Sequence, residues 1–278
     1  IVNLLQLNPD EKIATMIPIS GFEDGKYLLM ATKEGIIKKT ELKEYCNIRK
    51  GGLIALELRE GDELINARLA DEEKDIMLVT RKGMSIRFSE ADVRSTGRAS
   101  IGVRGITLRE GDSVIGMDIC DPENSLLIIT EKGFGKRTDI VEYRIQSRGG
   151  KGLLTYKISE KTGELAGMMM VNDANDVMLI TTEGVIIRIH AEDINIIGRN
   201  TSGVRLMRTT ETNLIVSCAK TDREDEDPED SEAAEKPEIS DGDEEGADLE
   251  TLPETSDDAV EGPDTEAGRD ILNKLDIE

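Results

Sequence analysis

A short phrase, Thr-x-x-Gly, recurs four times along this chain of 278 residues. Its glycines stand 48, 50 and 51 residues apart, at Gly35, Gly83, Gly133 and Gly184. Self-similarity at a fixed period near 50 residues indicates one supersecondary unit that is repeated, because each unit buries its apolar face against its neighbours. The chain is therefore expected to fold as an array of similar units.

Apolar segments surround each copy of the phrase and predict its secondary structure. Continuous apolar runs, such as residues 76–79 and 126–129, precede it and are typical of strands buried on both faces. The x-x-Gly then suits a hairpin loop with glycine in the left-handed region, where a Cβ is penalised. A second hairpin signal follows in each unit, for example Arg-Glu-Gly-Asp at 59–62 and 109–112. Two hairpins make four strands, so we predict an all-β, propeller-like array of four-stranded blades of about 50 residues.

The repeat also predicts where the units begin and end. We expect four complete blades, at residues 21–70, 71–120, 121–171 and 172–220. Residues 1–20 match a second hairpin that lacks a first one, so they are interpreted as the second half of a truncated blade in a longer array. Residues 221–278 contain no aromatic side chain and are rich in Asp, Glu, Pro, Ser and Gly, which predicts a disordered acidic tail.

The net charge is distributed unevenly between these segments. Of the total of -23, residues 221–278 contribute -21 and residues 1–220 only -2. The negative net charge of the chain therefore comes almost entirely from the predicted tail. It does not exclude a polyanionic partner for the folded part.

Residue usage argues against several classes of function. The three cysteines lie far apart without a C-x-x-C pair, which suits a reducing compartment and argues against a zinc site or a disulfide framework. His190 is the only histidine, and we interpret it as a strand-edge residue. No apolar run approaches the roughly 20 residues needed to cross a bilayer. We expect no catalytic residue, metal site or cofactor site in this chain.

Basic residues recur in phase with the glycines. One set stands four residues after each glycine. Another set stands fifteen residues after each glycine, within Gly-rich loops between the two hairpins. Glycine lets a backbone approach a phosphate closely, and arginine adds bidentate donors. In a single copy such cations would be explained by pairing with neighbouring acids, but four copies in phase favour a continuous basic rim. The predicted DNA-binding residues are Lys38, Lys39, Arg49, Lys50, Arg87, Arg98, Arg104, Lys136, Arg137, Arg148, Lys151, Arg188, Arg199 and Arg205.

A basic rim suits a long polyanion, and duplex DNA is the natural candidate. The chain has no Trp, 3 Phe and 4 Tyr, which argues against single-strand binding, where bases stack on aromatic rings. We therefore expect phosphate contacts, little base readout, a bent duplex and steep salt dependence.

Several stretches resemble the C-terminal domain of the A subunit of bacterial DNA gyrase. They are Ile-Val-Asn-Leu-Leu at 1–5, Val-Arg-Gly-Ile at 103–106, Ser-Arg-Gly-Gly-Lys-Gly at 147–152 and Ile-Asn-Ile-Ile-Gly-Arg-Asn-Thr-Ser-Gly-Val at 194–204. An acidic tail after the last repeat is a further similarity. The family's basic box belongs to the first blade, which this sequence lacks. Residues 147–152 resemble the box in a later repeat, so only a phosphate-contact role is carried over to them.

The resemblance implies a six-bladed β-pinwheel, which is a propeller-like ring whose blades exchange strands. It also implies that this domain wraps duplex DNA. The whole enzyme would be an ATP-dependent type II topoisomerase that introduces negative supercoils. It implies the gyrase B subunit and a second copy of the A subunit as partners in an A2B2 assembly, with ATP and Mg bound elsewhere in the enzyme. It also implies a bacterial cytoplasmic location close to the nucleoid, without membrane contact.

Three other interpretations stay open at this point. The corresponding domain of the topoisomerase IV A subunit bends DNA but wraps it less. A protein-interaction propeller would hold a peptide on its rim, although the Trp signatures of such repeats are absent. An enzyme with its site in the central channel would need histidine or paired acids there. Separately, the acidic tail could compete with DNA for a basic rim to which it is tethered.

Overall fold

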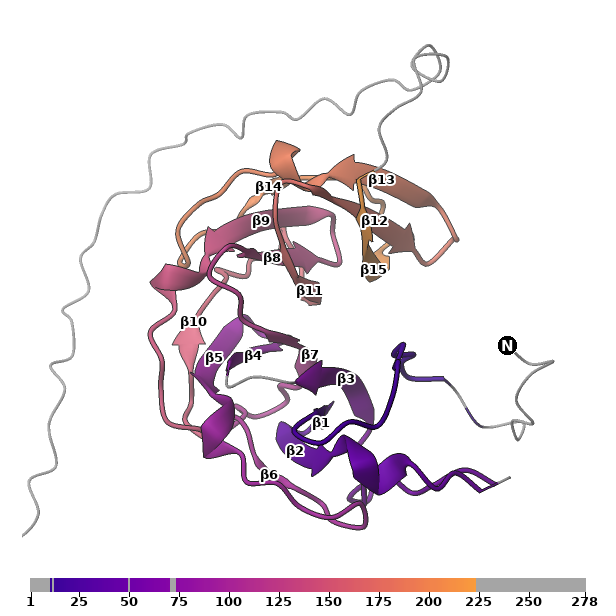
Figure 1. Ribbon diagram of the computed structural model, residues 1–278. Helices are drawn as coiled ribbons and strands as arrows, with labels where there is room; N and C mark the ends of the chain where they lie inside the picture. Colours follow the sequence, from indigo (N-terminus) through magenta and orange to yellow (C-terminus); the bar gives the residue numbers. More distant parts are fainter. Residues whose placement is uncertain (1–10, 12, 50, 71–73, 224–278) are drawn as a thin grey trace, which may run out of the picture. The chain divides into compact units, whose positions relative to one another are not determined.

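The computed structural model describes residues 11, 13–49, 51–70 and 74–223, and these are all-β apart from four short 3-10 turns (Figure 1). The first sheet contains β1 (Tyr27–Thr32), β2 (Ile36–Glu41), β3 (Leu64–Ala70) and β6 (Val103–Arg104). The second contains β4 (Asp75–Thr80), β5 (Met84–Ser89), β7 (Val114–Ile119) and β10 (Leu153–Leu154). The third contains β8 (Ser125–Thr130), β9 (Phe134–Asp139), β11 (Leu165–Val171) and β14 (Val204–Arg205). The fourth contains β12 (Asn175–Thr181), β13 (Ile186–His190) and β15 (Ile215–Asp222).

Each Thr-x-x-Gly phrase closes the predicted first hairpin of its unit. In the first copy, the Thr32 hydroxyl accepts a hydrogen bond from the Ile36 N–H at 3.2 Å, and the Gly35 N–H donates to the Thr32 carbonyl at 3.0 Å. The same two bonds recur in the other three copies. All four glycines have φ between 79° and 84°, a conformation that penalises a Cβ. The phrase therefore recurs because both of its fixed residues are needed to close the turn.

At Gly35, Gly83 and Gly133, the chain of the following repeat passes directly over the glycine. The Gly83 carbonyl accepts hydrogen bonds from the N–H groups of Thr155 and Tyr156, and a Cβ on Gly83 would lie 2.6 Å from the Tyr156 oxygen. On Gly133 a Cβ would lie 2.2 Å from the Met207 oxygen. Glycine is thus required for close contact between repeats as well as for the turn.

The second hairpin expected from the residues does not close within one sheet, because its two strands join different sheets, as the resemblance to the gyrase domain implied. Within the third repeat, β10 leaves to pair with β5 of the preceding sheet, with Leu153 opposite Ser85, whereas β11 pairs with β8 of its own sheet. β6 and β14 join β2 and β9 of the preceding sheets in the same way. Three sheets therefore gain their outermost strand from the next repeat, which is the strand exchange of a β-pinwheel. The fourth sheet has three strands within the described residues.

The core lies between consecutive sheets. Alternate residues of one strand face opposite sheets: Leu78 belongs to the cluster shared with the first sheet, and Met77 to the cluster shared with the third. Both side chains are completely buried, as the continuous apolar runs predict. A third cluster joins the third and fourth sheets. Packing between repeats, rather than within one sheet, therefore holds the fold together.

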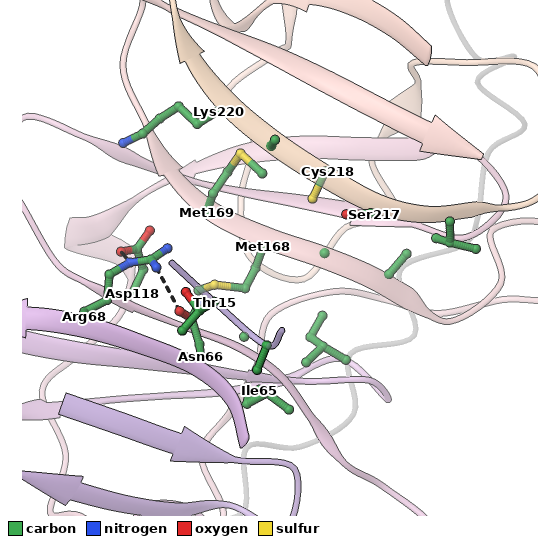
Figure 2. Close-up of a pocket in the computed structure, with 17 residues that line it drawn as sticks. Thr15, Ile65, Asn66, Arg68, Asp118, Met168, Met169, Ser217, Cys218 and Lys220 are labelled. Carbon is green, nitrogen blue, oxygen red and sulfur yellow. Dashed lines mark hydrogen bonds and ion pairs between the residues drawn. The ribbon is translucent and has the colours of Figure 1, made fainter. Parts of the chain in front are cut away.

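The innermost strands β3, β7, β11 and β15 follow one another (Figure 1). Together with residues 14–15 they line a cavity of about 570 Å³, whose lining residues are drawn in Figure 2. Inside it, Arg68 pairs with Asp118 at 3.1 Å and donates to the Asn66 side chain at 2.8 Å. The Lys220 ammonium donates to the Met170 carbonyl at 3.0 Å. These bonds tie neighbouring inner strands to each other.

Two of the predicted segments lie partly outside the described residues. Thr221 and Asp222, expected in the tail, belong to β15, and the rest of the predicted tail from 224 lies outside the described residues. Most of the predicted half-blade at 1–20 also lies outside them, and its described part, residues 11 and 13–20, contains no strand. Within the described parts of the chain, no helix is long and apolar enough to cross a membrane.

Candidate nucleic-acid interface

Three basic loops follow the 3-10 turns η2 (Glu90–Asp92), η3 (Ile140–Glu142) and η4 (Ala191–Asp193). We call them the first, second and third basic loops, at residues 94–104, 144–154 and 195–205. Each lies on the return strand of the preceding repeat, where one parallel bridge fixes its start, as between Arg87 and Ile145. A glycine with positive φ then brings its end close to the same strand: a Cβ on Gly152 would lie 2.3 Å from the Ser85 oxygen. The parallel bridge and the glycine thus hold each loop against the return strand of the preceding repeat.

The second basic loop is hydrogen-bonded to the end of the first. The Arg148 guanidinium donates to the Arg104 carbonyl, and the Gly149 N–H donates to the Gly105 carbonyl at 2.8 Å. The Thr107 N–H returns a bond to the Gly150 carbonyl at 2.9 Å.

The third basic loop repeats this link to the second. The Arg199 guanidinium donates to the Leu154 carbonyl at 2.9 Å, and the Lys157 N–H donates to the Thr201 carbonyl at 3.0 Å. The three loops therefore form one connected basic surface along the outermost strands.

Exposed cations stand along this surface. Arg104, Lys151 and Arg205 were predicted and are exposed, with the Arg205 guanidinium 5.1 Å from the centre of the Phe134 ring. Arg49 was also predicted and is exposed, but it lies before the three loops. Arg98, Arg148 and Arg199 are half-buried members of the same loops. Lys50 lies outside the described residues.

Sequence reasoning missed two exposed bases on the surface, Arg94 and Arg144. They stand at the same position in the second and third repeats, eleven residues after the glycine. Cys46 and Asn195 occupy this position in the other two repeats. The charge recurs in only half of the units, so it lies outside the two sets of bases that recur in every copy.

The cations four residues after each glycine have a structural role that the sequence interpretation did not include. Each pairs with a carboxylate: Lys39 with Glu90 at 3.0 Å, Arg87 with Asp75 at 2.7 Å, Arg137 with Asp173 at 2.5 Å and Arg188 with Asp176 at 2.7 Å. Arg87 also donates to the Ile140 carbonyl of η3 at 2.9 Å, and Arg137 to the carbonyl of Ile194, directly after η4, at 2.8 Å. Lys39, Arg87 and Arg137 thereby bond to the following repeat, whereas Arg188 pairs with Asp176 of its own sheet. Contact of these four cations with DNA stays a prediction.

Lys38 and Lys136 are placed inside the protein rather than on the rim, with side chains that are almost completely buried. Their ammonium groups donate to backbone carbonyls of the basic segments. Desolvation by burial lowers the pKa of Lys136 to about 8, and it lowers the pKa of Lys38 as well. Neither ammonium is positioned to meet a phosphate.

Other constellations offer little chemistry within the described residues. No group of three or more His, Cys, Asp and Glu that could hold a metal ion occurs there. His190 lies 2.6 Å from the Asp176 carboxylate at the end of β13, as a strand-edge residue. The titratable groups lining the inner cavity are the Arg68–Asp118 pair, Cys218 and Lys220, so the described cavity lacks the histidine or paired acids that a site there would need.

Strand-exchanged antiparallel sheets with connected basic loops define a β-pinwheel repeat domain. The family described as "DNA gyrase C-terminal domain, beta-propeller" matches residues 26–71, 74–121, 124–172 and 175–222. The chain belongs to this family.

Similar proteins agree with this assignment. The chain is 54% identical over 233 residues to the A subunit of DNA gyrase from Clostridium acetobutylicum and 40% identical over 239 residues to that from Escherichia coli K12, with 84% of the chain covered in each case. It spans 28% and 27% of the lengths of those two relatives.

Two solved structures have the same fold. The C-terminal domain of DNA topoisomerase IV matches with a TM-score of 0.75 at 27% identity, over 80% of this chain and 69% of that one. The DNA gyrase A C-terminal domain matches with a TM-score of 0.72 at 26% identity, over 79% and 73%. The folds alone do not separate the two enzymes, but the identity to gyrase relatives favours gyrase over topoisomerase IV.

Proposed function

We propose that this chain binds duplex DNA without sequence preference and bends it along the connected surface of the three basic loops. The hydrogen bonds between consecutive loops support this proposal, because they align the exposed cations of separate repeats along one path. Phosphates repeat along a duplex, so a path of cations held on a rigid scaffold complements its backbone. Base readout plays little part, since no helix or long ribbon projects from these loops to enter a groove.

The electrostatics of the proposed contact predict its salt dependence. About eight phosphates neutralised by the exposed and half-buried loop cations would give a log–log slope near -7. The cations four residues after the glycines are satisfied by carboxylates and carbonyls, so they contribute little to this number.

The family suggests the setting in which this contact operates. We propose that the chain forms part of the A subunit of a DNA gyrase, a type II topoisomerase, and that wrapping presents a crossover to the rest of the enzyme. The B subunit and a second copy of the A subunit would complete an A2B2 assembly in the bacterial cytoplasm, close to the nucleoid. ATP and Mg would be bound by other parts of that enzyme.

Paired substitutions on and off the rim test the proposal. Arg104→Ala with Lys151→Ala should weaken duplex binding and reduce the salt slope by about 1.8, because two phosphate contacts are lost. Lys33→Ala with Arg109→Ala removes the same charge from turns outside the basic loops, where both residues are exposed, and should change the slope much less.

Ligation of a nicked plasmid in the presence of the chain separates wrapping from simple binding. A wrapped duplex changes the linking number of the closed product, and this change should shrink in the rim variant but not in the off-rim variant. Equal slopes and equal linking numbers in both variants would contradict the assignment of DNA to the basic loops.

A further inference from the structure

Two of the four return strands carry a buried lysine three residues after the glycine. Lys38 and Lys136 are 1% and 0% exposed, whereas the other two repeats have Ile86 and Ile187 at this position. Ile86 is 1% exposed and packs in the core, so an apolar side chain satisfies the position in this fold. A buried ammonium costs free energy unless its donors are satisfied. Core packing alone therefore does not explain the lysines.

The Lys136 ammonium has a partner for each of its three donors, and all three belong to the third basic loop. It donates to the Gly198 carbonyl at 2.7 Å, to the Thr201 hydroxyl at 3.0 Å and to the Arg199 carbonyl. The ring of Tyr156 lies 5.4 Å from the ammonium. A single ammonium group is thus hydrogen-bonded to three oxygens within residues 198–201.

Lys38 makes the corresponding contact with the first basic loop. Its ammonium donates to the Arg98 carbonyl and, at 2.8 Å, to the Ala55 carbonyl of the preceding basic segment. Arg98 and Arg199 occupy equivalent positions, fifteen residues after the glycine. Both lysines therefore hold the carbonyl of the arginine that belongs to the proposed DNA surface.

The second basic loop has no lysine beneath it. There Ile86 lies below the loop, and a Cβ on Gly150 would be 3.6 Å from its Cδ1 atom. The loop is held instead by the Arg148 guanidinium, which donates to the carbonyls of Asp92 and Arg104. The protein thus supports equivalent loops in two different ways, which provides an internal comparison.

We propose that Lys38 and Lys136 are positioning residues for DNA wrapping: each buried ammonium fixes the backbone of the next repeat's basic loop and so sets the direction of its arginine. The proposal rests on the proposed function, because the arginine matters through its contact with DNA. The lysines themselves touch no phosphate, since their side chains end inside the protein.

The ionisation of Lys136 gives this arrangement a dependence on pH. Its pKa is lowered to about 8, chiefly by desolvation, while the Glu142 carboxylate raises it and the Arg199 guanidinium lowers it. A neutral amine has two N–H donors instead of three, so one of the three loop oxygens loses its partner above pH 8. The folded pKa lies below the ordinary value of 10.5, so this group by itself makes the fold more stable as pH rises between about 8 and 10.5. A loss of wrapping in that interval would therefore come from the loop and not from unfolding driven by Lys136.

Lys136→Met in the full chain tests the proposal, with Ile86→Met as the matched control at the same position of another repeat. In the absence of DNA, Lys136→Met should raise the rate of amide hydrogen exchange in residues 196–203 and leave the second basic loop unchanged. It should weaken duplex binding by about tenfold, which corresponds to the loss of roughly one charge-assisted hydrogen bond. Unchanged exchange in the third loop would overturn the proposal whether or not the chain wraps DNA, so this arm is independent of the proposed function.

A double-mutant cycle with Arg199→Ala shows whether the lysine acts through the arginine. If it does, Lys136→Met should have a smaller effect on duplex binding in the Arg199→Ala background than in the wild-type chain. Additive effects would show that Lys136 acts on DNA independently of Arg199, and the proposal would then be wrong.

A pH series on the wild-type chain keeps the test decisive if Lys136→Met fails to fold. The linking-number change should decrease between pH 7 and 9.5, with a midpoint that follows the titration of the Lys136 13Cε resonance near pH 8. The Ile86→Met chain keeps Lys136 and should show the same profile. A linking-number change that stays constant while Lys136 loses its proton would refute the positioning role, whereas failure of the wild-type chain to change linking number at pH 7 would refute wrapping itself.

Discussion

Arg137→Met is the substitution that best separates cations that hold the fold from cations that meet DNA. The Arg137 side chain is 6% exposed, and its guanidinium donates to the Ile194 carbonyl at 2.8 Å and to the Glu192 carbonyl at 3.4 Å. It also pairs with Asp173 at 2.5 Å. Methionine keeps an apolar stem of similar length and removes only the charged donors.

The contacts set the expected loss of stability. A bond from a charged donor to a buried carbonyl contributes about 1.5–3 kcal/mol, and the long bond to Glu192 lies at the weak end. The Asp173 side chain is 73% exposed, so its ion pair adds at most about 1 kcal/mol. We expect a loss of about 2–4 kcal/mol in the free energy of unfolding, which lowers Tm by about 5–15 °C for a folded part of this size.

Urea and thermal unfolding followed by circular dichroism measure this loss, since the chain has no tryptophan for fluorescence. Repeat arrays can unfold in stages, so hydrogen exchange should be followed at the Ile197 N–H, which donates to the Arg137 carbonyl at 2.9 Å. The exposed Arg104→Met is the control and should change stability by less than about 0.5 kcal/mol. Below its Tm, the Arg137→Met chain should keep the wild-type salt slope of DNA binding. A stability loss under about 1 kcal/mol, together with a slope reduced by about 0.9, would refute the structural role of Arg137.

Three further outcomes are expected. Gly133→Ala should prevent stable packing of the next repeat, because its Cβ would lie 2.2 Å from the Met207 oxygen at a φ of 79°, and a lowered Tm measures this; an unchanged Tm would show that the hairpin relaxes freely. In the native chain only Cys46 should react rapidly with a thiol reagent at pH 8, because desolvation raises the pKa of the Cys120 and Cys218 thiols to about 12. Two or more fast equivalents would contradict the desolvation of these two thiols. Deleting residues 224–278 removes a strongly acidic segment while keeping β15, which ends at Asp222, and should tighten duplex binding in low salt; equal affinities across a salt titration would show that the segment does not compete with DNA.

The first hairpins could be predicted from sequence because their causes are local. Thr130 and Gly133 close the third turn through bonds within five residues, and the apolar run before them is long enough to show burial on both faces. Because the unit repeats about every 50 residues, the same argument applies to each copy along the chain. For the same reason the propeller-like, four-stranded blades and the position of the basic loops between hairpins were accessible without coordinates, whereas the strand exchange of a β-pinwheel was expected only from the family resemblance.

The second hairpin could not be assigned from sequence, because its pairing depends on a competition between sheets. Leu153 and Leu154 form a two-residue strand, and such a short segment contains no signal for which sheet it joins. Gly152 beside it permits the close approach to Ser85, which requires the neighbouring repeat to be in place.

The sequence alone determined that this protein is a repeat array with cations in phase. The turn residues and apolar runs are local features of the sequence, and they recur at a fixed period. Only the tertiary structure decided what each cation does. Lys136 meets its oxygen partners 62 to 65 residues along the chain, and Arg137 meets Ile194 57 residues away. A lysine beside an arginine looks the same in sequence whether it faces solvent or a buried carbonyl. Folding separates the two cases, because a charge taken out of water must be satisfied by groups that only the neighbouring repeat supplies.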